Sequence, residues 1–364
     1  MCAAPINLLN LDRQGCEQLA VQLGGKPFHG RNLFKWVHKH GALDVQAMTD
    51  LSAALRQRLA AETVIELPRV VREQQSVDGT IKWVMELGDG QRIETVSIPE
   101  PRRLTLCISS QVGCGLGCPF CATARQGLSR NLSTAEIIGQ VWVAARRLAE
   151  HDRRPSNIVL MGMGEPLANL KAVVTAVNIM QDDLAYLLAY YRVTLSTAGL
   201  VPQIARLRSQ CRVALAVSLH APDDALRNEL VPINRRYPLA QLVDACRAYV
   251  AADQRQRITW EYIMLDGVND HLHQAKALVR LLQGVPSKVN LIPFNPFLGS
   301  DYAPSPAEQI AAFRERLMRS GIVTTIRKPR GDEIAAACGQ LVGRVEQRRV
   351  RPSQVAAAFA GGVQ

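Results

Sequence analysis

The 364-residue sequence lacks the features that mark membrane and secreted proteins. It contains no run of 18 or more apolar residues, so we expect no membrane-spanning helix. Its first residues lack the basic n-region and the apolar core of a signal peptide. Its nine cysteines are odd in number and scattered, which argues against a disulfide framework. With 48% hydrophobic residues, the composition predicts a soluble globular protein, and the free cysteines suit the reducing cytoplasm.

The sequence also has few acidic residues after residue 100. Residues 1–100 carry 11 Lys and Arg against 12 Asp and Glu, whereas the remainder carries 32 against 20. An excess of this size suits a phosphate-rich partner, although a solvated basic surface explains the charge equally well. Basic residues recur at Arg102-Arg103, Arg146-Arg147, Arg153-Arg154, Arg235-Arg236 and at Arg327, Lys328 and Arg330.

One stretch, from Cys107 to Gly127, concentrates unusual residues and reads CISSQVGCGLGCPFCATARQG. Within it Cys114, Cys118 and Cys121 follow the spacing Cys-x-x-x-Cys-x-x-Cys, with glycines interleaved. Because a glycine-rich loop loses much chain entropy when it is ordered, a ligand common to three thiolates would explain its composition. Iron–sulfur clusters are normally held by four thiolates, so three would leave one iron open for a substrate or cofactor.

Another interpretation of these cysteines, a structural metal site, stays open. A structural zinc site would need a fourth ligand from a distant part of the chain, because no histidine and no second Cys-x-x-Cys lies nearby in the sequence. The corresponding functional alternative is a non-enzymatic RNA-binding protein with a structural metal. The spacing and the glycine setting favour the open cluster.

From residue 102 onward, predicted strands alternate with helical stretches. One helix is predicted over Thr134 to Glu150, with Ser133 or Thr134 as its N-cap. The alternation indicates a parallel sheet with right-handed crossovers, whose site lies at the carboxyl ends of its strands. The six predicted strands are Leu104–Ile108, Asn157–Met161, Tyr191–Ser196, Val213–Ser218, Thr259–Leu265 and Val289–Phe294.

The first hundred residues follow other patterns. Residues 5–60 predict short helices around a small core, and residues 67–100 alternate with the period of strands. Turn signals at Asp78-Gly79 and at Gly88-Asp89-Gly90 divide the second segment into a hairpin or meander. The near-neutral charge of these hundred residues gives no support to RNA binding by them alone.

Several motifs together resemble those of a known family. The three-cysteine spacing is similar to that of radical S-adenosylmethionine (radical SAM) enzymes, and SSQVGC with CATARQG resembles the RlmN/Cfr family of RNA adenine methyltransferases. The resemblance covers most of the chain in order. It continues through MGMGEPLANL at Met161 to Leu170, LSTAGLVP at Leu195 to Pro202, SLHAPDDALRNELVPINRRYP at Ser218 to Pro238, IPFNP at Ile292 to Pro296 and RGDEIAAACGQL at Arg330 to Leu341.

The resemblance implies an α/β fold, a partial (β/α)6 radical SAM barrel. It places a small helical RNA-contacting domain at residues 1–66 and a β-hairpin or meander extension at residues 67–100. The catalytic barrel is then expected at residues 101–345, with a basic, frayed tail at residues 346–364.

The resemblance also implies site residues that the pattern alone would leave as ordinary strand-end or packing residues. Cys114, Cys118 and Cys121 would hold a [4Fe–4S] cluster. Cys338 would be methylated first, Cys107 would be needed later, and Glu94 would accept a proton. The expected contacts to S-adenosylmethionine are Gly164 and Glu165 at its amino group, together with Ser196, Ser218, Leu219, His220 and Asn295. We interpret Cys2, Cys16, Cys211 and Cys246 as structural.

The chemistry of methylating adenine at C2 explains why these cysteines and cofactors are needed. C2 of adenine is an electron-poor carbon that cannot attack a methyl sulfonium, whereas a thiolate such as Cys338 can. A second S-adenosylmethionine, reduced by one electron, would give a radical that takes hydrogen from the methyl group on Cys338. The resulting methylene radical would add to the adenine ring, a base would remove the ring proton, and attack of Cys107 on Cys338 would release the product and leave a disulfide. Glu94 and Cys107 both stay candidates for the base.

The implied substrates are one adenosine of 23S rRNA in the peptidyl transferase centre and an anticodon-adjacent adenosine of tRNA. We expect a monomer supplied with electrons by flavodoxin or ferredoxin, because no second cluster motif is present. The nearest alternative is Cfr-like methylation of C8, since both activities share every motif quoted. A radical SAM tRNA methylthiotransferase would want three more ordered cysteines, and the N-terminal third offers only Cys2 and Cys16 before Cys107.

Overall fold

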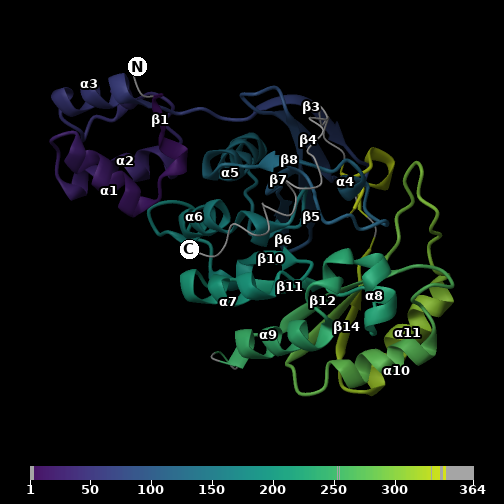
Figure 1. The fold of residues 1–364 in the computed structure, drawn as a ribbon. Helices are drawn as coiled ribbons and strands as arrows, with labels where there is room; N and C mark the ends of the chain where they lie inside the picture. The colour runs from purple at the N-terminus through teal and green to yellow at the C-terminus, as the bar shows by residue number, and fades with distance from the viewer. Residues whose placement is uncertain (1–3, 252, 254, 329, 337–338, 342–364) are drawn as a thin grey trace.

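The computed structural model describes residues 4–251, 253, 255–328, 330–336 and 339–341. Its first part is a group of helices set apart from the main sheet, on the side where α5 (Thr134–Ala149) and α6 (Leu170–Gln181) lie (Figure 1). Asp12 and Ser52 cap two of these helices by accepting backbone N–H groups, and Pro27 begins the other. The elements are β1 (Ile6–Asn7), η1 (Leu8–Asn10), α1 (Arg13–Gln22), α2 (Pro27–His38), η2 (Val45–Ala47), α3 (Ala53–Glu62) and β2 (Thr63–Val64).

The centre of the molecule is a ten-stranded sheet in the order β14-β13-β12-β11-β10-β9-β6-β5-β4-β3. The strands from β3 to β6 pair antiparallel, and β6, β9, β10, β11, β12, β13 and β14 are parallel neighbours in that order. The meander is β3 (Arg69–Gln75), β4 (Ile81–Glu86) and β5 (Arg92–Glu100), and the parallel part is β6 (Arg103–Cys107), β9 (Asn157–Leu160), β10 (Val193–Thr197), β11 (Ala214–Ser218), β12 (Ile258–Met264), β13 (Ser287–Pro293) and β14 (Val323–Ile326).

Helices connect the parallel strands, as the alternating pattern predicts. Ser133 caps α5 and Glu136 completes a capping box, so this helix begins where the sequence indicates. None of the helices in the described ranges has the length and apolarity that a bilayer crossing requires. The helices of this part are α5 (Thr134–Ala149), α6 (Leu170–Gln181), α7 (Val201–Gln210), α8 (Asp224–Leu230), α9 (Leu239–Ala251), α10 (Leu272–Leu281) and α11 (Ala307–Arg319), with the turns η3 (Pro166–Asn169), η4 (Tyr190–Arg192), η5 (Pro232–Arg235) and η6 (Asp332–Ile334).

The six predicted parallel strands are confirmed, with ends that shift by one or two residues. The largest shifts, of two residues, are at the starts of β10 and β13; β10 begins later than predicted because residues 190–192 form a 3-10 turn before it. The prediction missed β14, whose four residues are too few and too exposed to show a clear period. The sheet has β14 at one edge and β3 at the other, so it is an open, partial barrel.

Strand register shows which side chains share a face of the sheet. Thr194 of β10 is opposite Val159 of β9, which is opposite Cys107 of β6. Ser196 follows Thr194 by two residues, and alternate residues of a strand point to the same face. We call this the inner face; the same register adds Ser218 and Glu261 to it.

Hydrogen bonds join the N-terminal helices to the sheet's outer helices. The side chain of Trp142 in α5 donates to the carbonyl oxygen of Val37 at 3.1 Å, and the N–H of Ala135 donates to Asn10 at 2.8 Å. The guanidinium of Arg13 also donates to Asp182, after α6, at 2.8 Å. The N-terminal helices therefore pack on the outer side of the sheet.

Candidate active site

The three-cysteine loop emerges from a small hairpin formed by β7 (Gln111–Gly113) and β8 (Leu128–Asn131). Gly113 has φ +77°, and a Cβ there would lie 1.9 Å from the carbonyl oxygen of Gly127. The N–H of Cys114 donates to that same oxygen at 2.8 Å. Glycine is therefore required where the ends of the loop approach each other, just before the first cysteine.

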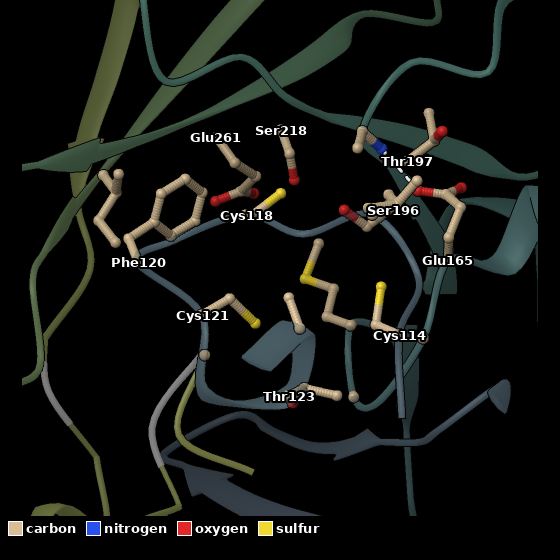
Figure 2. Close-up of a pocket in the computed structure, with 18 of the residues that line it drawn as sticks. Cys114, Cys118, Phe120, Cys121, Thr123, Glu165, Ser196, Thr197, Ser218 and Glu261 are labelled. Carbon is tan, nitrogen blue, oxygen red and sulfur yellow. Dashed lines mark hydrogen bonds between the residues drawn. The ribbon is translucent and has the colours of Figure 1, made fainter. Parts of the chain in front are cut away.

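The sulfur atoms of Cys114, Cys118 and Cys121 all face one cavity (Figure 2). Cys114 is buried, which raises the pKa of its thiol to about 12, and the other two are half-buried. In the part of the chain that the structure describes, no three His, Cys, Asp or Glu side chains come together as a single metal ion would require. Since a four-iron cluster binds each thiolate at a separate iron, three cysteines spread around one cavity fit a cluster. They give no support to structural zinc.

A buried carboxylate, Glu165, lines the same cavity. It follows β9 and accepts N–H groups from Leu167 at 3.0 Å and from Ala198 at 2.8 Å. Burial raises its pKa to about 7, although these hydrogen bonds favour the carboxylate. A carboxylate so placed can receive an ammonium group, because a cation would relieve the cost of burying its charge.

The turn before Glu165 depends on glycine. Gly164 has φ +100°, and a Cβ there would meet the side chain of Gln111 at 2.5 Å. The Gln111 side chain in turn accepts the N–H of Glu165 at 2.8 Å. The hairpin that begins the cysteine loop thus also fixes the position of the carboxylate.

His220 lies in the cavity wall after β11, with a left-handed backbone (φ +62°). Its Nδ1 accepts the N–H of Ile263 at 3.0 Å, and its ring meets that of Phe120 edge-on at 4.7 Å. Burial, together with the nearby charge of Arg227, lowers its pKa to about 3. The imidazole is therefore neutral and carries its proton on Nε2, which can donate to a bound molecule.

Most of the predicted cofactor contacts converge on the cavity. Gly164, Glu165, Ser196, Ser218 and His220 line it. Leu219 is not among the lining residues, and its side chain is fully buried in the core. Asn295 follows β13, half-buried, and is also not a lining residue. The predicted methyl acceptor, Cys338, lies outside the described residues, as do Cys2 and the predicted tail 346–364.

Two charged residues near the cavity have no place in the sequence prediction. Glu261 in β12 lines the cavity, accepts a hydrogen bond from Asn290 at 2.8 Å, and has its pKa raised by burial. The side chain of Arg227 is fully buried and donates to the carbonyl oxygens of Ala198, Ser218 and Leu219. Glu261 is a charged residue within an otherwise apolar strand. This contrast is a sequence signal that could have revealed Glu261, because glutamate is seldom fully buried unless it has a partner.

The two remaining predicted residues, Glu94 and Cys107, lie on the inner face of the sheet. Val96 of β5 is opposite both Lys82 of β4 and Cys107 of β6, and Glu94 precedes Val96 by two residues. All four side chains therefore share this face. The sequence alone would leave Glu94 as a solvated strand residue; it is instead buried, 3.7 Å from the ammonium group of Lys82.

The cysteines interpreted as structural fit that interpretation where the structure describes them. Cys16 and Cys246 are buried in α1 and α9, and Cys211 is half-buried at the end of α7. No disulfide joins any two of the cysteines that the structure describes.

Comparisons with known proteins agree with this geometry. A family model of the ribosomal RNA large subunit methyltransferase N-terminal domain matches residues 6–65, and the radical SAM superfamily model matches residues 108–279. The chain is 54% identical to the dual-specificity RNA methyltransferase RlmN of Alkalilimnicola ehrlichii, over 96% of this chain and 97% of that protein. A radical SAM methyltransferase from Sphaerobacter thermophilus, known from its crystal structure, is 45% identical with a TM-score of 0.87. That match covers 93% of this chain and 99% of the other.

These matches bear out the predicted resemblance over nearly the whole chain. A [4Fe–4S] cluster and S-adenosylmethionine are the cofactors of this superfamily. The three thiols, the carboxylate of Glu165 and the neutral His220 around one cavity fit both groups. The chain therefore belongs to the RlmN family of radical SAM RNA methyltransferases.

Proposed function

We propose that this protein methylates C2 of an adenosine in the peptidyl transferase centre of 23S rRNA and of an anticodon-adjacent adenosine in tRNA. The observation that supports the proposal most is the cavity in which three thiols of one loop face Glu165, Ser196 and Ser218. The relative from Alkalilimnicola ehrlichii is named a dual-specificity RNA methyltransferase, which supports both RNA substrates.

Different residues around the cavity would bind the cluster and S-adenosylmethionine. Cys114, Cys118 and Cys121 would hold the cluster, which supplies one-electron cleavage of S-adenosylmethionine to a deoxyadenosyl radical. Glu165 would bind the ammonium group of S-adenosylmethionine, and its two N–H donors keep the carboxylate oriented. Gly164, Ser196, Ser218, Leu219, His220 and Asn295 would complete the contacts to this molecule.

Cys338 would accept a methyl group from the first of two S-adenosylmethionine molecules used per turnover. After carbon–carbon bond formation with the adenine ring, the adduct would give up the ring proton to a base and one electron to the oxidised cluster, and the thiol of Cys107 would then attack the sulfur of Cys338. That step would form a disulfide and break the bond between the Cys338 sulfur and the methylene carbon, which takes up a proton and becomes the methyl group of the released product. Glu94 and Cys107 are both candidates for the base, because both side chains are buried on the inner face; the carboxylate of Glu94 lies 3.7 Å from the ammonium group of Lys82.

The proposal extends to the partners. An external one-electron donor such as flavodoxin or ferredoxin would reduce the cluster and, after turnover, the disulfide would be reduced by thiols of the cytoplasm, where we place the protein. The protein would act as a monomer. The helical domain at residues 1–66 and the meander at residues 67–100 would assist a catalytic domain at residues 101–345.

Replacement of the two cysteines tests the covalent mechanism. Cys338→Ala removes the methyl acceptor, so the protein should form neither methylcysteine nor an RNA adduct. Cys107→Ala keeps the acceptor but removes the thiol that resolves the adduct. Protein isolated from such cells should carry RNA bound through Cys338, seen as a nuclease-sensitive shift on a denaturing gel.

A packing defect cannot mimic this result. Both substitutions remove one sulfur atom, so any loss of stability would be of the same kind in both variants. Cys246→Ala, in the buried core of α9, is the matched control and should yield RNA-free, active protein. If Cys107→Ala and Cys338→Ala both yield RNA-free protein, the covalent mechanism is wrong.

A further inference from the structure

The turn between β3 and β4 holds the segment that leads to Cys338. Glu94 is the predicted site residue that lies nearest to this turn in the sequence. We call residues 76–82, between β3 and β4 and into β4, the hairpin anchor, and residues 330–336 the C-terminal segment. The carboxylate of Glu333 accepts the hydroxyl of Ser76 at 2.6 Å and the N–H of Val77 at 2.9 Å. These two bonds join parts of the chain more than 250 residues apart.

Two further residues of the hairpin anchor, Asp78 and Lys82, strengthen the attachment. The carboxylate of Asp78 accepts the N–H of Gly331 at 3.3 Å and lies 3.6 Å from the guanidinium of Arg330. The ammonium group of Lys82 donates to the carbonyl oxygen of Ala335 at 3.2 Å. The hairpin anchor therefore holds the C-terminal segment at its beginning, its middle and its end.

The described residues after Cys338 are held by the cysteine loop instead. The N–H of Ala122 donates to the carbonyl oxygen of Gly339 at 2.7 Å, and the hydroxyl of Thr123 donates to that of Leu341 at 2.6 Å. Ala122 and Thr123 follow directly on Cys121, and Gly339 and Leu341 line the cavity. The chain is thus fixed on both sides of Cys338, first to the hairpin anchor and then to the cysteine loop.

Lys82 connects this attachment to the predicted base. Its side chain is buried, on the inner face with Cys107, and the carboxylate of Glu94 is 3.7 Å from its ammonium group. The same group donates to Ala335, three residues before Cys338. A buried ammonium needs such partners, because an isolated charge in the interior is costly.

We propose that the hairpin anchor positions the methyl-accepting cysteine, with Lys82 as the positioning residue that links Glu94 to the C-terminal segment. This inference rests on the proposed role of Cys338. Removing the contacts of the hairpin anchor should free the C-terminal segment and slow the methylation of Cys338. The affinity for S-adenosylmethionine should stay nearly unchanged, because Glu165 lies at the end of β9, outside the hairpin anchor.

The test uses the full-length protein with its cluster and two variants. Glu333→Ala removes two hydrogen bonds at an exposed residue, so it should not impair folding, and Lys82→Met removes the buried ammonium. In each, we expect hydrogen exchange of residues 330–336 to rise about tenfold, and the rate of methylcysteine formation to fall about tenfold, while the Kd for S-adenosylmethionine changes by less than about twofold. Lys82→Arg, which keeps the charge and the donors, should recover most of the rate.

Two matched controls remove charges outside the hairpin anchor. Glu315→Ala on α11 and Arg72→Met on β3 should leave both the exchange and the methylation rate unchanged. Wild-type rates of methylcysteine formation in Glu333→Ala and Lys82→Met would overturn the inference, and so would unchanged exchange of residues 330–336. If the wild-type protein itself forms no methylcysteine at Cys338, the proposed function fails, and the inference fails with it.

Discussion

Replacing Glu165 with glutamine should weaken the binding of S-adenosylmethionine about 30-fold. The side chain is buried in the cavity wall, and its hydrogen-bond donors among the described residues are uncharged: the N–H groups of Leu167 and Ala198 and the side chain of Thr197. Glutamine has nearly the same shape, so the variant removes the charge and leaves the cavity filled. The effect therefore reports the interaction between the carboxylate and an ammonium group.

The magnitude follows from this setting. A hydrogen bond to a charged group contributes up to about 3 kcal/mol, and the upper value applies here because donor and acceptor are both charged; a neutral one contributes about 1 kcal/mol, so loss of the charge should cost about 2 kcal/mol of binding energy. At about 1.4 kcal/mol for each factor of ten, that cost raises Kd about 30-fold. The side-chain amide of the variant can accept only one of the two N–H groups, which lowers stability in the free and the bound protein alike and leaves Kd unaffected.

The pH dependence gives a second, independent signature. Burial raises the pKa of Glu165 to about 7, so part of the free protein holds this group protonated at neutral pH. Only the carboxylate attracts an ammonium group, so affinity should rise as pH increases from 5.5 through 7, where the group is about half ionised, and level off near pH 8. Above about pH 8 it should fall again, because the α-amino group of the ligand loses its proton. The rising part should be missing in Glu165→Gln.

Isothermal titration calorimetry of the anaerobically reconstituted protein measures both effects. Glu261→Gln is the matched control, because its carboxylate lines the same cavity but already pairs with Asn290. We expect its Kd to change by less than about threefold. A strong loss of affinity in Glu261→Gln with little change in Glu165→Gln would refute the placement of the ammonium group.

Two further predictions concern the cluster and the RNA. Cys118→Ala should abolish the brown absorbance and the bound iron of anaerobically purified protein; full iron content in this variant would exclude Cys118 as a ligand. Replacing Arg235 and Arg236, both exposed at the end of η5, with glutamine should lower RNA affinity more than replacing Lys35 of α2 and Lys39, its C-cap. Filter binding over a salt series should show a shallower salt dependence for the arginine variant, and equal effects of the two pairs would contradict RNA binding through the main sheet.

The parallel part of the fold could be predicted because its strands are apolar runs bounded by helices. β11 and β12 are buried on both faces, and such runs stand out from the amphipathic helices between them. The ends of these strands also located Glu165, Ser196 and Ser218, because parallel strands place sites at their carboxyl ends. β1, β2 and β14 were missed, since strands of two to four residues carry too little pattern.

The rest of the site depends on contacts between distant segments, which no local pattern reveals. The sequence pattern around Lys82 does not predict that this strand residue is buried. Its burial results from the approach of Glu94 and of Ala335, which lies 253 residues later in the chain. The burial of Arg227 depends likewise on three carbonyl oxygens from the ends of two neighbouring strands. Such residues can be found only once the sheet order and the path of the later chain are known.

The central claim, methylation of adenosine C2 in both RNA classes, is tested most directly by mass spectrometry of nucleosides. 23S rRNA and tRNA are compared between cells with this protein, cells lacking it, and cells in which Cys338→Ala replaces it. We predict that 2-methyladenosine is present in both RNA classes with the wild-type protein and absent from both in the other two strains. Retention of 2-methyladenosine without the protein, or loss of 8-methyladenosine instead, would contradict the account.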